Sequence, residues 1–180
     1  MSDIAGWAGH LGAPLPFVAG HEPAGVIEEL GASVKGFNVG DRVGFMPASR
    51  VCGACSECIK GEHRFCTKRT NVGFDGPYGG FSTYCLADPL STAKIPDGLS
   101  DEAAAPLLCA GVTAYGALKK VAKVQTSGTL LNIIGCGGVG HLVIMYAKAM
   151  GYRVHACECQ SSLISMLILI FCQSTWRTTS

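Results

Sequence analysis

The sequence has few charged residues and no long hydrophobic run. Charged residues make up 15% of the 180 residues, and the formal net charge is +1 without any run of basic side chains. This distribution gives no indication of a nucleic-acid partner. The longest apolar run extends from Leu163 to Phe171, whereas a membrane-spanning helix takes about 20 residues. We therefore expect no nucleic acid and no membrane among the partners.

A secretory signal is also missing from the first residues. Residues 1–6 provide neither a basic region nor an apolar segment of the kind that opens a signal peptide. The ten cysteines are therefore better explained by a reducing cytoplasm, in which thiolates bind metal, than by secretion. Hydrophobic residues make up 48% of the chain, which is enough for a buried core in one domain or two small ones.

Four cysteines lie in one short segment at the spacings C-x2-C-x2-C-x7-C, namely Cys52, Cys55, Cys58 and Cys66. Four thiolates can surround one zinc ion as a tetrahedron and leave no open coordination position. Such a zinc is structural, because its binding energy folds the loop that carries it. Gly53 and Gly61 allow the tight turns that this requires. A disulfide-bonded loop or four unrelated cysteines are the alternatives, and the two successive x2 spacings favour zinc.

Short strands separated by glycine turns are expected before residue 100. The pattern predicts them in the middle of residues 20–34, from Gly40 to Phe45, from Phe81 to Ala87 and from Ala93 to Ile95. Strands of this kind are typical of a small barrel-like β domain. A glycine- and proline-rich loop with one helical turn near residues 4–7 precedes them.

The pattern becomes helical from Ser100 onwards. Ser100 is a suitable N-cap for a helix with acidic residues in its first turn, and Pro106 is expected to interrupt that helix. A second helical stretch covers residues 107–121. An apolar strand over residues 129–134, a helix over 141–150 and a strand over 153–157 then predict a β-α-β unit.

The turn of this unit carries the pattern G-x-G-x-x-G, which includes Gly135, Gly137, Gly138, Val139 and Gly140. Between a strand and a helix, this pattern predicts that the helix N-terminus binds the pyrophosphate of a dinucleotide. Glu158, at the end of the second strand, stands where an acidic residue binds the adenosine ribose. A carboxylate there repels a 2′-phosphate, which favours NAD over NADP. The alternative is an ordinary glycine-rich turn.

His21, Glu22 and Cys109 are further residues of the metal-ligand type. On chemistry alone the case for a site is modest. A single His after a glycine is most often a turn or surface residue, and a single Cys in an apolar helix is most often part of the core. The residue types therefore leave both interpretations open.

Taken together, these motifs resemble the zinc-dependent alcohol dehydrogenases of the medium-chain dehydrogenase/reductase superfamily. The segment Gly20-His21-Glu22-x-x-Gly25-x5-Gly31-x-x-Val34 matches the zinc signature of that family, and the four-cysteine segment matches its structural zinc loop. Matches continue in Leu108-Cys109-Ala110-Gly111-Val112-Thr113-x-Tyr115 and over residues 147–154. The resemblance extends from about Ser2 to Glu158.

The resemblance implies roles that the spacing does not show. His21 and Cys109 would be two ligands of a catalytic zinc, with Glu22 as a nearby or alternate ligand. Ser2 would relay the proton away from the alcohol, and Thr113 would lie by the nicotinamide. Asp3 would orient His21 through a hydrogen bond, and Trp7 would line the substrate pocket.

The sequence departs from the family pattern near both ends. The third catalytic ligand of the family is a Cys two residues before the relay hydroxyl, a position that falls before Met1. Ala5 stands where some members place a relay His. After Glu158 the match to the family stops, so residues 161–180 are expected to be a divergent tail.

The expected fold is α/β with a β-rich part. Residues 1–110 would form a GroES-like β-barrel domain, incomplete at its N-terminus, that binds zinc. Residues 111–160 would begin a Rossmann NAD-binding domain with its first β-α-β unit.

The expected function is NAD-linked hydride transfer between a small-molecule alcohol and an aldehyde or ketone, with zinc as a second cofactor. One alternative is an inactive, truncated chain that binds one structural zinc without catalysis. Another is an interaction module or redox sensor built on the zinc loop. Full-length relatives oligomerise, which this shorter chain need not do.

Overall fold

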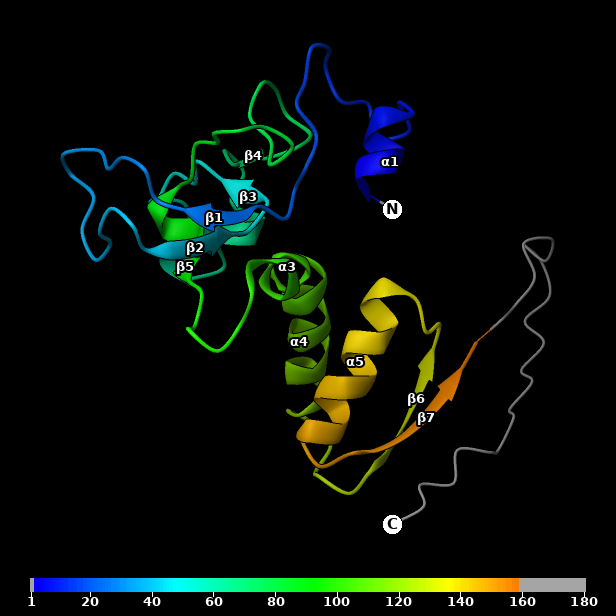
Figure 1. Ribbon diagram of the computed structural model, residues 1–180. Helices are drawn as coiled ribbons and strands as arrows, with labels where there is room; N and C mark the ends of the chain where they lie inside the picture. Colours follow the sequence, from blue (N-terminus) through cyan, green and yellow to red (C-terminus); the bar gives the residue numbers. More distant parts are fainter. Residues whose placement is uncertain (1, 159–180) are drawn as a thin grey trace. The chain divides into compact units, whose positions relative to one another are not determined.

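The computed structural model describes residues 2–158 and divides the chain into two compact units (Figure 1). The border falls between Cys109 and Ala110. The tail expected over residues 161–180 lies outside the described residues. Within residues 2–158, no helix is both long enough and apolar enough to cross a membrane.

The first unit is built around a three-stranded antiparallel sheet. Strand β2 (Arg42–Phe45) lies in the middle, between β1 (Ala24–Val26) and β5 (Thr92–Lys94). A second, two-stranded sheet pairs β3 (Ala48–Ser49) with β4 (Thr70–Asn71). In the described part of the chain these sheets stay open and form no closed barrel. The predicted strands near residues 24–26, 40–45 and 93–95 are confirmed.

Short helices complete the first unit. They are α1 (Ser2–Trp7), α2 (Ser56–Ile59), α3 (Asp101–Ala104) and the 3-10 turns η1 (His63–Phe65), η2 (Pro89–Ser91) and η3 (Ala105–Leu108). Ser100 caps α3 as predicted, because its side chain accepts a hydrogen bond from the backbone N–H of Ala103. Pro106 lies inside η3, so the predicted interruption takes the form of a change from α-helix to 3-10 helix.

The strand predicted from Phe81 to Ala87 is wrong. These residues have no regular structure, although three of their large apolar side chains, Phe81, Tyr84 and Leu86, are 63–74% exposed. The hydroxyl of Ser82 lies 2.7 Å from the carbonyl oxygens of both Gly79 and Tyr84. Such local side-chain to backbone bonds compete with strand pairing. The sequence pattern therefore identified an apolar segment but not a paired strand.

The second unit contains the predicted β-α-β unit. Strands β6 (Leu130–Ile134) and β7 (Arg153–Cys157) are parallel, with Leu130 opposite Arg153 and Ile134 opposite Cys157. Helix α5 (Gly138–Ala149) connects them and begins three residues before the predicted start at residue 141. Helices α4 (Ala110–Val121) and α5 lie side by side (Figure 1).

The core of the second unit explains why these elements pack together. Leu118, Ile133, Ala147 and Tyr152 are at most 9% exposed and form one cluster. The Tyr152 hydroxyl donates a hydrogen bond to the carbonyl oxygen of Gln125, so its polar end is satisfied. The apolar side chains recur at helix and strand spacing, which is the pattern from which the elements were predicted.

Candidate metal centres and cofactor loop

The four cysteines of the predicted zinc loop converge on one point. All four sulfur atoms lie within 4.8 Å of one another. The Sγ atom of Cys52 lies 4.0 Å from that of Cys58 and 3.6 Å from that of Cys66. Zinc–sulfur bonds of about 2.3 Å in a tetrahedron require sulfur atoms about 3.8 Å apart. The spacing of the donor atoms therefore fits a single zinc ion, and residues 52–66 are called the cysteine lobe below.

Local backbone geometry brings these sulfur atoms together. Gly53 and Gly61 have φ angles of 68° and 76°, so both turns use the left-handed region that glycine adopts without strain. Helix α2 presents Cys58, and η1 leads the chain to Cys66. Cys66 is fully buried and Cys58 is 6% exposed, whereas the other two sulfur ligands are half-buried.

Hydrogen bonds from backbone N–H groups lower the pKa values of three of the four lobe thiols. The pKa of the Cys52 thiol lies below its ordinary value, chiefly because of hydrogen bonds from the N–H groups of Ala54 and Cys55. The N–H groups of Cys58 and Cys52 lower the pKa values of Cys55 and Cys66 in the same way. Burial raises the pKa of Cys58 to about 12. This donor pattern suits sulfur atoms that carry negative charge, as metal-bound thiolates do.

The disulfide alternative is not what the structure describes. Cys52, Cys55, Cys58 and Cys66 are all free thiols. Cys85 is also free and half-buried, and burial raises its pKa. It lies outside the lobe and provides a matched comparison for the lobe cysteines.

A second cluster brings together residues that lie far apart in the sequence. His21, Glu22 and Cys109 each place a ligand atom within 4.8 Å of the others. His21 is 6% exposed, and the other two are half-buried. A nitrogen, a carboxylate oxygen and a sulfur are all donors that zinc accepts, and three protein ligands leave a fourth position open. The donor set therefore fits a catalytic type of zinc site.

The His21 ring is held by Asp3. The Nδ1 atom of His21 donates to Oδ2 of Asp3 at 2.7 Å, and Oδ1 of Asp3 accepts from the N–H of Gly20 at 2.8 Å. A carboxylate on one ring nitrogen fixes the tautomer and leaves the other nitrogen, Nε2, to bind metal. Phe74 packs against the same ring, with 5.1 Å between ring centroids.

The loop that carries His21 has a shape that only glycine permits. Gly20 has a φ angle of 96°, and a Cβ there would lie 2.5 Å from the backbone nitrogen of Phe81. Its carbonyl oxygen accepts a hydrogen bond from Gly80 at 2.7 Å. Gly20 therefore lets residues 19–21 lie directly on residues 80–81, which fixes the start of the His21 side chain.

A hollow of roughly 430 Å³ opens beside this cluster. His21 and Glu22 line it, together with Asp3, Phe81, Asp101 and Glu102. Its size suits a small molecule. The first unit therefore combines a hollow with three adjacent donors, the buried His21 and the half-buried Glu22 and Cys109.

The other residues predicted for the active site, Ser2, Trp7 and Thr113, are all exposed. Ser2 is the exposed first residue of α1, next to Asp3. Trp7 is 81% exposed. Thr113 lies on the exposed side of α4, in the second unit. Their roles remain predictions.

The glycine-rich loop joins β6 to α5 as predicted. Gly135 has a φ angle of 90°, Gly137 is the N-cap of α5, and Gly138 and Val139 begin the helix. A Cβ at Gly140 would overlap the carbonyl oxygen of Gly135, so helix and turn approach as closely as glycine allows. Such close packing at a helix N-terminus is what a pyrophosphate site requires.

Glu158 reaches back to this loop from the end of β7. Its Oε2 atom accepts a hydrogen bond from the N–H of Cys136 at 2.5 Å. The predicted ribose ligand and the predicted pyrophosphate loop are therefore neighbours within the second unit.

Sequence reasoning missed Phe74 and Arg42. Phe74 packs against the His21 ring, and Arg42 binds Asp101 at the start of α3. Both contacts join residues from distant parts of the chain, and neither residue belongs to a motif. No signal in a single sequence identifies such pairs.

Comparison with known proteins agrees with this geometry. Residues 1–97 match the alcohol dehydrogenase GroES-like domain. An alcohol dehydrogenase from Geobacillus stearothermophilus is 45% identical over 144 residues, which are 80% of this chain and 42% of that protein. The chain thus spans about two fifths of the length of the curated relatives that it matches.

Solved structures show the same similarity. The CAD protein from Helicobacter pylori, complexed with NADP(H), matches with a TM-score of 0.77 and 34% identity, over 86% of this chain and 47% of that one. Acetophenone reductase from Geotrichum candidum, in complex with NAD, matches with a TM-score of 0.75 and 34% identity, over 86% and 46%. The GroES-like match covers more than half of the chain, so this protein belongs to the zinc-type, medium-chain alcohol dehydrogenase family.

Proposed function

We propose that this chain carries the metal and cofactor sites of an NAD-linked alcohol dehydrogenase. The reaction would convert an alcohol and NAD⁺ into an aldehyde or ketone, NADH and a proton. The observation that carries the proposal is the convergence of His21, Glu22 and Cys109 beside a hollow of small-molecule size. The cysteine lobe would hold a second, structural zinc.

The protein groups would have distinct tasks at this centre. Zinc bound there would act as a Lewis acid on the alcohol oxygen. Asp3 would keep the His21 ring in the orientation and tautomer that metal binding requires. Burial of His21 beside Phe74 would keep water away from one side of the site. Ser2, at the start of α1, would accept the released proton.

NAD is the nicotinamide cofactor that the second unit favours. Glu158 is the charged residue next to the glycine-rich loop, and a carboxylate there repels the 2′-phosphate of NADP. Gly135, Gly137 and Gly140 support the pyrophosphate interpretation through their positions at the start of α5. The relatives include proteins bound to either cofactor, so the preference rests on Glu158.

The second candidate function is zinc binding without catalysis. It is supported by the difference between the two centres: the cysteine lobe offers four thiolates, whereas the His21 cluster offers only one. A carboxylate in place of a thiolate alters both the affinity and the Lewis acidity of a zinc site. A chain of this kind would retain the structural zinc and turn over no alcohol.

One assay separates the two candidates. The purified chain is supplied with zinc, NAD⁺ and a series of primary alcohols, and NADH formation is followed by absorbance. Zinc-dependent turnover that His21→Ala abolishes and Cys85→Ser leaves unchanged supports the dehydrogenase. No turnover, with one zinc bound per chain, supports the structural candidate. The same assay with NADP⁺ tests the role of Glu158, since Glu158→Gln should narrow the preference for NAD⁺.

A further inference from the structure

Strand β2 lies next to both halves of the His21 cluster. On one side it pairs with β1, where Ala24 lies opposite Gly44. The N–H of Phe45 also donates to the carbonyl oxygen of Pro23, one residue after Glu22. The residues that follow His21 and Glu22 are therefore bonded to the backbone of β2.

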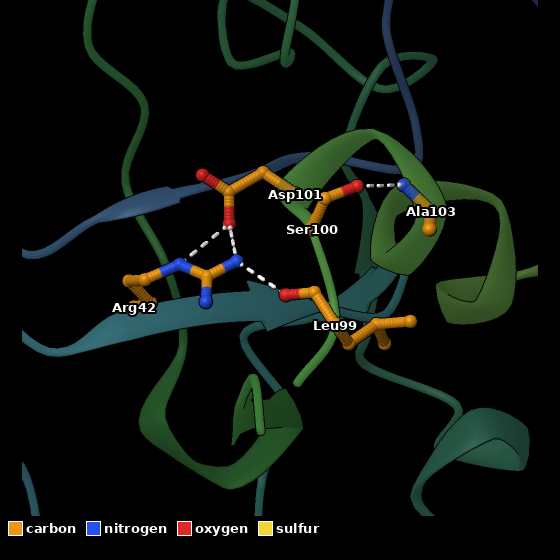
Figure 2. Close-up of polar contacts among 5 residues, drawn as sticks. All are labelled: Arg42, Leu99, Ser100, Asp101 and Ala103. Carbon is orange, nitrogen blue, oxygen red and sulfur yellow. Dashed lines mark hydrogen bonds and ion pairs between the residues drawn. The ribbon is translucent and has the colours of Figure 1, made fainter. Parts of the chain in front are cut away.

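The segment that leads to Cys109 is bonded to β2 through Arg42. Figure 2 shows the guanidinium of Arg42 between Asp101 and Leu99, at the start of α3. Its Nε and Nη2 atoms donate to Oδ1 of Asp101 at 3.0 and 2.6 Å. The Nη2 atom also donates to the carbonyl oxygen of Leu99 at 2.6 Å. Ser100, between these two partners, caps α3.

A second contact, between Leu108 and Gly44, holds the end of this segment on β2. A Cβ at Gly44 would lie 2.5 Å from Cδ1 of Leu108, so glycine is what lets Leu108 rest on β2. Arg42 and Gly44 are two residues apart on one strand and therefore face the same side. Leu108 directly precedes Cys109. Residues 99–108, called the connector below, are thus held by β2 at both ends.

We propose that Arg42 is a positioning residue for the His21 metal centre, because it holds the connector on β2 and thereby keeps Cys109 within reach of His21 and Glu22. This inference rests on the proposed function. The Arg42–Asp101 ion pair is partly exposed, with side-chain exposures of 31% and 41%. Exposed pairs contribute little to stability. The effect of Arg42 is therefore on the geometry of the centre rather than on the fold.

Cobalt(II) chloride provides the test, because its absorption reports the ligands of each site. The full chain is titrated with cobalt, and the binding step that His21→Ala removes is assigned to the His21 centre. Cobalt in the cysteine lobe absorbs more strongly in the near ultraviolet, since it has four thiolate ligands. The lobe thus serves as an internal measure of folding in every variant.

Arg42→Ala should weaken cobalt binding at the His21 centre by about tenfold or more, the effect typical of groups that orient metal ligands. Arg42→Lys should give an intermediate value, because lysine lacks the planar fork. Asp101→Asn by itself should weaken cobalt binding at the His21 centre. The double variant Arg42→Ala/Asp101→Asn should bind cobalt little more weakly than Arg42→Ala, since both residues act through one contact. Lys94→Ala is the matched control. It removes another ion pair of the same unit, in which Nζ of Lys94 lies 2.7 Å from Oδ2 of Asp41, and it leaves the connector unchanged.

The outcomes distinguish the role of Arg42 from the existence of the His21 metal centre. A selective loss at the His21 centre, with the lobe unchanged, supports the role of Arg42. Equal cobalt affinity in Arg42→Ala and Lys94→Ala overturns it, and so does an equal loss from both centres, because Arg42 would then serve the fold. A wild-type chain without any His21-dependent cobalt contradicts the metal centre itself.

Discussion

The cysteine lobe should depend on zinc for its structure, and Cys58→Ser is the perturbation that tests this. Within residues 52–66 the buried apolar residues are the ligands Cys58 and Cys66 themselves. The large apolar side chains Ile59 and Phe65 are 76% and 52% exposed. The helices α2 and η1 have four and three residues, too few to be stable alone. The lobe therefore has almost no core other than its sulfur atoms.

The magnitude follows from this arrangement. Structural zinc sites bind with about 10–16 kcal/mol at neutral pH, which corresponds to dissociation constants from roughly tens of nanomolar to picomolar. Ordering a residue costs about 1–2 kcal/mol of backbone entropy. With so little apolar burial to oppose that cost, most of the free energy that orders the lobe must come from the metal. Losing one of four thiolates should release the zinc and unfold residues 53–67 locally.

The assay combines zinc content with limited proteolysis. Wild-type chain should retain the lobe zinc against a chelator of micromolar affinity and resist cleavage between residues 53 and 67. Cys58→Ser should lose that zinc and become sensitive there. Cys85→Ser, the same chemical change at a half-buried free thiol outside the lobe, should behave as wild type. A metal-free wild-type chain with a protease-resistant lobe would refute the reasoning.

Two further substitutions probe the second unit. Gly140→Ala should weaken NAD binding markedly in calorimetry, because the new methyl group overlaps the carbonyl oxygen of Gly135. At Gly138 a Cβ meets nothing within 4 Å, so Gly138→Ala is the control. An equal loss of NAD affinity in both variants would contradict the packing explanation. Leu118→Ala should destabilise this unit by about 2–5 kcal/mol, because Leu118 is 2% exposed. Hydrogen exchange of α5 amides measures this, and Leu130→Ala, at a side chain 48% exposed, should cost clearly less.

The features that the sequence predicted well are local ones. The four lobe cysteines lie within one short segment, so their spacing already limits the geometry. The β-α-β unit is equally local, since the apolar period and the glycine turn specify its strands and helix. In both cases neighbouring residues carry the information.

Contacts between distant segments could not be predicted in the same way. Arg42 and Asp101 are 59 residues apart, and nothing in either local pattern indicates that they meet. The residue types of His21 and Cys109 left other interpretations open, and only the resemblance to the family predicted that the two share a site. The segment from Phe81 to Ala87 shows the opposite error: its composition suits a strand, but strand formation needs a partner that a local pattern cannot supply.

That unpaired segment has a consequence for the behaviour of the protein at high concentration. Residues 81–87 contain no charge and no proline, and they expose two aromatic rings and a leucine side chain. This composition is typical of sequences that pair with copies of themselves as intermolecular β-structure. Self-association of the chain should therefore begin at this segment, which also borders the hollow beside His21 through Phe81.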